Sequence, residues 1–320
     1  MKQDIFKKPK HMTSIGGQAL IEGLMMIGPK NAAIAIRKPD GEILVEKRPL
    51  PIKSKLSKVP IVRGFAGIFK QMVLGIKALM FSAEFMDLEG EEEEDEKPSK
   101  IDRFLKKVFG EKLQDVVIYV SVVFSLLFSI GLFMVLPNTI AWLLPIDKTT
   151  GTGTVLYNLV EGAIRVILFI LYLSLTSQMK DIRRVWQYHG SEHKTIHCYE
   201  NEEELTVENV KKHSTRHPRC GTSFLFTVMI ISILLFSLVG QHGLWINILL
   251  RVVLIPFVAG ISYEIIKIAG RSESLIARII NTPGLMFQGF TTREPDDSQI
   301  EVAIEAMKNV LVEDKEEDKW

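Results

Sequence analysis

The sequence lacks the features typical of disulfide-bonded, nucleic-acid-binding and secreted proteins. Only two cysteines occur in 320 residues, which gives no basis for a disulfide framework. The net charge is +1, so the charge balance provides no argument for a nucleic-acid partner. The first residues, MKQDIFKKPKH, are polar and lack the apolar core of a signal peptide. The chain also has no internal repeat and no glycine-rich phosphate-binding loop, which leaves its hydrophobic segments as the main indication of its class.

Long hydrophobic runs are abundant. Hydrophobic residues make up 47% of the chain, and a bilayer-spanning helix needs about 20 of them in succession. Four runs qualify: 116–136, 155–177, 224–239 and 245–262. The predicted fold class is therefore mainly α. The chain is predicted to be a polytopic membrane protein with about four transmembrane helices, a small N-terminal β-hairpin element and cytosolic helices. Its expected partner is the lipid bilayer.

Lysine and arginine are distributed unevenly between the predicted loops. They are frequent before the first span, between the second and third spans and after the fourth, whereas the loop 137–154 contains only Lys148. Because basic loops stay on the cytosolic side, we expect both termini and the segment 178–222 to be cytosolic in a protein of the cell membrane. Cys198 and Cys220 would then lie in a reducing compartment.

Composition divides the chain into four regions. Residues 1–88 form a cytosolic N-terminal region, and 89–99 an acidic linker predicted to be disordered. Residues 100–264 form the transmembrane region, which includes the cytosolic His/Cys-rich loop 178–222. The cytosolic C-terminal region, 265–320, contains a predicted amphipathic helix that starts near an N-cap in Asp-Asp-Ser and ends in a charged, frayed tail.

The N-terminal region contains two predicted elements. The stretch AAIAIRKPDGEILVEKR has alternating apolar residues on both sides of a Pro-Asp-Gly turn, which predicts a β-hairpin. In 61–85, Arg63, Lys70 and Lys77 recur every seven residues among apolar ones, so they share one face of a helix. This helix is predicted to lie in the membrane interface, to pack as a globular helix with a basic edge, or to form a fifth span.

Histidine is concentrated in WQYHGSEHKTIHCYE and HSTRHPRCGTS, which hold five of the seven histidines. In the first stretch His189, His193 and His197 are four residues apart, so a helix would let the first two bind one ion. HGSEH also matches the H-x-x-E-H pattern of inverted zinc peptidases, in which the glutamate, here Glu192, polarises a water. Gly190 disfavours the required helix by about 1 kcal/mol relative to alanine.

The second stretch supplies His213, His217 and Cys220. Pro218 favours a turn between the last two, and an H-x-x-C turn is similar to half of a zinc knuckle. If the second and third spans are antiparallel, both stretches meet at the cytosolic membrane face. Nitrogen and sulfur ligands suit zinc. We therefore predict a divalent-metal site, with Glu192 as catalytic residue and four ligands: His189, His193, His217 and Cys220.

Two alternatives stay open for this cluster. The histidines could be interface residues beside Trp186 and Tyr188, each satisfied by water, backbone or lipid phosphate. If a metal binds, four filled ligand positions would indicate a structural site, whereas three would leave room for water next to Glu192 and indicate a catalytic one.

Ionisable residues also occur within the predicted spans. Glu161 and Arg165 are four residues apart and can pair on one helical face inside the membrane. Glu264, at the cytosolic end of the last span, is predicted to be a ligand or general base near Cys220, or an interfacial acid paired with Lys267.

Four separated motifs occur in order along the chain: SIGGQALIEGLMMIGP, YHGSEHKTIHCYE, HPRCGTSF and PGLMFQGFTTREPDDSQIEVAI. Together they resemble the YqhQ-like family of uncharacterised bacterial multi-pass membrane proteins, which carry the label of metal-dependent enzymes without an established reaction. The resemblance implies that the functional residues lie within them: Gly16, Gly17, Gln18, Glu22, Gly23, His189, Glu192, His193, His217, Pro218, Arg219, Cys220, Arg293, Glu294 and Pro295. His197 and His213 rank as outer-shell candidates.

The resemblance also draws attention to GGQALIEG. Paired glycines permit a close backbone approach or a positive φ, and Gln18 and Glu22 would share a face if a helix began there. We predict that this segment folds over the histidines as a lid or second shell, together with His197, His213 and Glu264.

The leading functional prediction is a metal-dependent membrane enzyme, a hydrolase at the cytosolic membrane face that acts on a membrane-associated peptide or lipid. The alternative is a non-enzymatic membrane scaffold or assembly factor with a structural metal site. A transporter comes third, with a polar path along Glu161, Arg165, Arg251 and Glu264.

Overall fold

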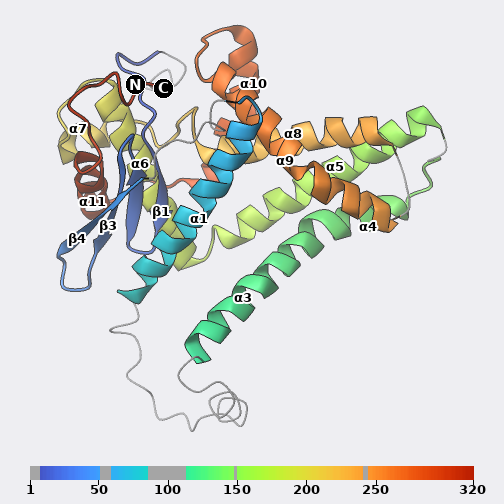
Figure 1. Cartoon of the computed structure of the whole chain (residues 1–320), viewed down its shortest axis with the longest axis horizontal. Coiled ribbons are helices and arrows are strands. Elements are labelled where there is room, and N and C mark those ends of the chain that lie inside the picture. The colour runs from blue at the N-terminus through green and yellow to red at the C-terminus, as the bar shows by residue number, and fades with distance from the viewer. Residues whose placement is uncertain (1–7, 51–58, 86–112, 148–149, 241–243) are drawn as a thin grey trace. The chain divides into compact units, whose positions relative to one another are not determined.

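The structure is a computed structural model, and the residues that it describes are 8–50, 59–85, 113–147, 150–240 and 244–320 (Figure 1). The acidic linker 89–99 lies outside them. Within the described residues the chain is mostly helical, with one small antiparallel sheet, as the sequence predicts. The chain forms two compact units, the first from 1–88, 172–234 and 253–320 and the second from 89–171 and 235–252.

The sheet of the first unit has four antiparallel strands in the order β1-β2-β3-β4. They are β1 (Gly16–Leu20), β2 (Gly23–Ile27), β3 (Asn31–Arg37) and β4 (Ile43–Pro49). The predicted hairpin is confirmed as β3 and β4, which pair from Asn31 with Pro49 to Arg37 with Ile43. Strands β1 and β2 are not predicted from the sequence, where their glycines and Gln18 favour a lid.

Both faces of this sheet are buried, since alternate residues point to opposite sides. On one face Leu24, Met26, Ala33 and Ala35 pack against helices α6 (Lys180–Glu200) and α11 (Asp297–Lys308). On the other face Leu20, Met25, Ile34 and Ile36 pack against α1 (Val62–Glu84), whose Ala78 is buried there. Helix α7 (Val207–Lys211) adds Val210 to a smaller cluster with Ile300 of α11.

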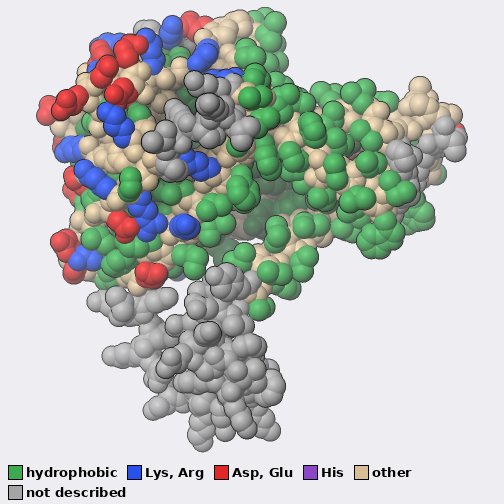
Figure 2. All heavy atoms as spheres, in the orientation of Figure 1, with side chains coloured by type: hydrophobic (Ala, Val, Ile, Leu, Met, Phe, Trp, Pro, Cys, Tyr) green, Lys and Arg blue, Asp and Glu red, His purple; other side chains and the backbone are tan. Residues whose placement is uncertain are grey.

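Among the described residues, five helices are long and apolar enough to cross a membrane. Four of these candidate spans cover the predicted runs. The first, 120–142, takes in the end of α3 (Leu113–Ile130), the π-helical turn η3 (Gly131–Val135) and α4 (Leu136–Trp142); the others are α5 (Gly151–Thr176), α8 (Gly221–Val239) and α9 (Leu244–Ala269). The fifth is α1, for which the sequence left open an interfacial helix, a globular helix with a basic edge and a fifth span. In Figure 2 hydrophobic side chains cover the long helices, whereas charged ones gather over the sheet-bearing part of the first unit. The protein is a membrane protein.

The second unit encloses a polar cluster among its apolar helices. Glu161 pairs with Arg165 on α5 and with Arg251 on α9, whose Nη1 lies 2.7 Å from Glu161 Oε1. Arg165 also donates from Nε to the carbonyl of Phe133, 3.0 Å away in the π-helical turn. Glu161 is 2% exposed, so one buried carboxylate here serves two cations.

The C-terminal region is more ordered than the sequence suggests. Helix α10 (Leu275–Thr291) follows α9, and α11 begins with a capping box between Asp296 and Gln299, so the predicted amphipathic helix is confirmed. The predicted frayed tail is wrong, because Asp318 is fully buried. Its carboxylate accepts hydrogen bonds from Thr13 at 3.0 Å and from Tyr199 at 2.8 Å.

Candidate metal centre

Helix α6 carries the histidine motif without interruption through Gly190. The carbonyl oxygen of Arg293 lies 2.0 Å from where a Cβ would stand at Gly190, so no larger residue fits. The Arg293 amide donates to the Trp186 carbonyl of the same helix at 2.9 Å. Glycine at this position lowers the helix propensity. Its missing side chain, however, permits the segment after α10 to pack against the helix that presents the imidazoles.

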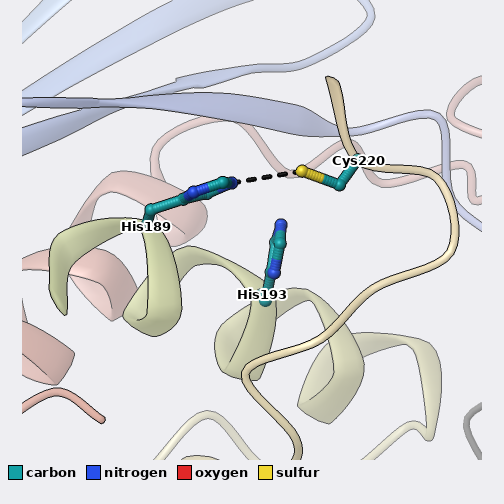
Figure 3. Close-up of side chains that lie close together, drawn as sticks. All are labelled: His189, His193 and Cys220. Carbon is teal, nitrogen blue, oxygen red and sulfur yellow. Dashed lines mark hydrogen bonds between the residues drawn. The ribbon is translucent and has the colours of Figure 1, made fainter. Parts of the chain in front are cut away.

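Three donor side chains meet next to this contact: His189, His193 and Cys220 (Figure 3). Their candidate ligand atoms all lie within 4.8 Å of one another. His189 Nε2 is 3.2 Å from Cys220 Sγ, and the rings of the two histidines are 4.4 Å apart. Cys220 precedes α8 directly, so the two ligand stretches come together as the sequence predicts from antiparallel packing.

Each imidazole is held through its other ring nitrogen. His189 Nδ1 lies 2.8 Å from the carbonyl oxygen of Thr291, and His193 Nδ1 lies 2.6 Å from that of Thr215. In the neutral imidazoles, a proton on each Nδ1 would donate to these carbonyls and leave both Nε2 atoms as acceptors, the arrangement that orients metal-binding histidines. Neither threonine is predicted from the sequence, since both act through the main chain and leave no side-chain pattern.

The electrostatics of the group favour a thiolate. Burial opposes ionisation of Cys220, but the charges of His189 and His193 hold the pKa of the thiol well below its usual range. Burial likewise lowers the pKa of His189, but the charge and hydrogen bond of Cys220 outweigh it and raise that pKa to about 9. A thiolate is the form of cysteine that binds metals.

Glu192 lies between this group and the sheet. Its carboxylate accepts a hydrogen bond from the Gly17 amide, and burial raises its pKa. Its Oε2 atom is buried and has no hydrogen-bond partner among the described residues. A Cβ at Gly17 would stand 3.0 Å from Glu192 Cδ and 2.5 Å from the Met25 carbonyl oxygen, so the glycine gives Glu192 its place beside β1.

His217 belongs to a second group, with His197 and Glu200, rather than to the first. Its ring lies 4.7 Å from that of His197 and 5.7 Å from that of His193. Burial lowers the pKa of His197 to about 4 and also lowers the pKa of His217, so both rings are neutral. The four predicted ligands are therefore divided three to one between two neighbouring groups.

A third group comprises Cys198, Glu203 and His213. His213 Nε2 is 3.2 Å from a carboxylate oxygen of Glu203. Burial raises the pKa of Cys198 to about 11, and its sulfur lies 3.5 Å from the Glu204 carbonyl oxygen, which accepts from a thiol. Cys198 is thus a protonated donor in the core, which accounts for it without a metal.

Comparison with known proteins gives a family without a known activity. Residues 59–313 match the family model described as a protein of unknown function, DUF1385. The chain belongs to this family. It is also 36% identical over 308 residues to the uncharacterized protein YqhQ of Bacillus subtilis (strain 168), which covers 95% of this chain and 94% of the relative. This match confirms the resemblance that the four motifs carry. No solved structure matches.

The GGQALIEG segment is part of the sheet. Gln18 lies on the face away from Glu192, with its Oε1 1.9 Å from where a Cβ would stand at Gly75 of α1, which corrects its interpretation as a lid over the histidines. Glu22 has a φ of 49° in the β1–β2 turn and pairs with Arg184 of α6, whose Nη2 donates to it at 2.6 Å. This ion pair connects the sheet to α6 just before the histidine motif begins.

Glu264 and the Arg293–Pro295 motif complete the predicted set. Glu264 accepts two hydrogen bonds from Arg63 of α1, at 2.7 and 2.5 Å, and lies in none of the three donor groups. It is therefore neither ligand nor base in this arrangement; Arg63 is its hydrogen-bond partner, and the charge of Lys267 also acts on it. Glu294 pairs with the buried Lys194 at 2.5 Å, which adds a second tie between its segment and α6.

Proposed function

We propose that this protein is a metal-dependent hydrolase of the membrane, in which His189, His193 and Cys220 hold a divalent ion and Glu192 acts on the attacking water. One observation carries the proposal. Three ligand atoms converge within 4.8 Å next to a buried carboxylate that has one oxygen without a partner among the described residues.

The donor set supports a zinc-like ion. Two imidazole nitrogens and one thiolate are ligands that zinc accepts, and three protein ligands leave one tetrahedral position open, as in catalytic sites. His217 would be the fourth ligand of a closed site, but it belongs to the neighbouring group. The geometry therefore favours the catalytic alternative over the structural one.

Each residue has a role that follows from its contacts. The carbonyls of Thr291 and Thr215 orient the imidazoles, and the Gly17 amide holds one oxygen of Glu192 in place. The other oxygen of Glu192 is available to take a proton from water and later return it to a leaving group. A bound divalent ion would supply Lewis acidity, polarising a scissile carbonyl or phosphoryl group and acidifying water.

The predicted topology supports a location at the cytosolic membrane face. The segment 178–222 that carries the site connects two helices able to span a bilayer, and its loop charges are basic. A substrate reaching this site would be a membrane-associated peptide or lipid.

A structural metal in a non-enzymatic scaffold is the second candidate, favoured by burial. His193 is 1% and Cys220 8% exposed, so the donors are enclosed by packed helices. In that case Glu192 would serve to connect α6 to β1.

Cobalt substitution tests the two candidates without knowledge of the substrate. The protein, purified in mild detergent without chelators, should contain stoichiometric zinc, and the His189→Ala, His193→Ala double variant should lose it while Cys198→Ser keeps it. In the cobalt form, acetohydroxamate should change the visible spectrum, since it binds an open metal position.

Three results separate the outcomes. A spectrum insensitive to acetohydroxamate but changed by His217→Ala would show a four-ligand site and favour the scaffold. Absence of metal from the wild type would reject both candidates. Glu192→Gln should keep the metal under either candidate. It should abolish the function of the protein in cells only if the protein is an enzyme.

A further inference from the structure

A cavity of about 310 Å³ lies in the first unit on the side of the second donor group. Both polar and apolar residues line it, and its walls come from distant parts of the chain. The chemically distinctive members of its lining are four cations and two histidines: Lys8, Lys10, Arg219, Arg271, His197 and His217.

Arg219 is already a cation within the second donor group. Its side chain is only 4% exposed and pairs with Glu200, and its Nη2 lies 3.4 Å from His217 Nε2. A divalent ion bound by His197, Glu200 and His217 would have to displace this guanidinium or share the carboxylate with it. The group is therefore better suited to present a fixed positive charge than to bind a second metal.

The rim of the cavity is also cationic. Lys8 and Lys10 are exposed, and neither forms an ion pair with any described residue. Arg271 donates to the main-chain oxygen of Trp320 at 3.2 Å, and Arg219 lies over the ring of Trp320, 5.6 Å from its centre. Two acids, Glu200 and Glu273, also line the cavity. Arg219 and Glu200 neutralise each other, which leaves Lys8, Lys10 and Arg271 against Glu273, so the net charge of the lining is positive.

The cavity lies at the ends of two helices that can span a membrane. Arg219 stands just before α8, which begins at Gly221, and Arg271 stands just after α9, which ends at Ala269. Lysine and arginine at such positions meet lipid phosphates. Immediately beyond Arg271, Leu275 and Ile276 of α10 are 73% and 70% exposed. They form an apolar surface that suits the same depth in a membrane as the lipid phosphates.

We propose that this cavity binds an anionic phosphoryl group, such as the phosphate of a lipid headgroup, and is the substrate subsite of the neighbouring metal centre. His217 connects the two, since it lines the cavity and its ring lies 5.7 Å from that of His193. Guanidinium groups bind phosphate through paired hydrogen bonds. The assignment to a substrate subsite rests on the proposed hydrolase, whereas binding of the anion does not.

Calorimetric titration of the full-length protein in neutral detergent tests the proposal. The metal is first removed by chelation, so that binding at the donor group does not contribute. The probes are inorganic phosphate, dihexanoyl phosphatidic acid and dihexanoyl phosphatidylcholine. The test variant is Lys10→Gln with Arg271→Gln, and the control is Lys47→Gln with Lys308→Gln, which removes the same charge from exposed positions outside the cavity.

The expected result is saturable binding of phosphatidic acid or phosphate that weakens by about tenfold in the test variant and stays near wild type in the control. Binding of phosphatidic acid alone identifies a lipid source, and binding of both probes identifies a phosphoryl subsite open to solvent. The proposal is overturned if neither anion binds, if the control variant loses as much affinity as the test variant, or if phosphatidylcholine binds as tightly as phosphatidic acid. Zinc content of each preparation, measured before chelation, reports on the proposed hydrolase separately.

Discussion

The carbonyl oxygen of Arg293 occupies the space that a side chain at Gly190 would need, 2.0 Å from the absent Cβ. Alanine should normally stabilise a helix relative to glycine by about 1 kcal/mol. Here the sign is reversed, because the carbonyl belongs to the main chain and cannot rotate away. Gly190→Ala should lower the free energy of unfolding by about 1–3 kcal/mol.

Thermal denaturation in mild detergent measures this effect. Gly67→Ala is the matched control, since Gly67 lies within helix α1 and has open space where a Cβ would stand. The control should be neutral or stabilising. Equal melting temperatures for the two variants would contradict the close approach of Arg293.

Glu161→Gln should be strongly destabilising. The substitution leaves Arg165 and Arg251 buried among apolar helices without their shared carboxylate. Breaking a buried ion pair by removing one partner costs about 3–5 kcal/mol. The triple variant Glu161→Gln, Arg165→Met, Arg251→Met removes all three charges and should recover much of the loss in the same unfolding assay. If Glu161→Gln alone is as stable as the wild type, the charges of Arg165 and Arg251 do not depend on the Glu161 carboxylate.

Cys198 should be unreactive in the folded protein. Because burial raises its pKa to about 11, the native thiol stays protonated at pH values where a thiol in the unfolded chain, with a pKa of about 8.5, is ionised. The stability from this group is therefore fully present below about pH 8.5 and is lost as the pH rises towards 11. Maleimide labelling of a Cys220→Ala variant at pH 8 should be slow in the native state and fast in denaturant; fast native labelling would refute the buried position.

Asp318→Ala should detach the C-terminal tail. The substitution removes the carboxylate that accepts from Thr13 and Tyr199, and leaving buried donors unsatisfied costs about 1–3 kcal/mol. Limited proteolysis should then cleave near the C-terminus at a protease concentration that leaves the wild type intact. Glu313→Ala, at an exposed position in the same tail, is the control and should not change the cleavage rate.

The sequence by itself determined the class of the protein and the segments that supply its candidate metal ligands. Runs of apolar residues as long as a bilayer is thick permit few structures other than membrane helices, and four of the five candidate spans are predicted in this way. The hairpin of β3 and β4 and the helix α11 follow from local alternation, turn residues and caps, which act within a few residues. The concentration of histidine in two stretches likewise predicted where the donor side chains gather.

Only the tertiary structure decided how those residues are divided. His189, His193, His217 and Cys220 look equivalent in the sequence, but packing of the turn before α8 against α6 assigns His217 to Glu200 and Arg219 instead. Gly17, Gln18, Glu22 and Gly190 owe their identities to neighbours more than 50 residues away in sequence, at Glu192, Gly75, Arg184 and Arg293. Such contacts depend on which helix faces which strand, and no local periodicity encodes that choice.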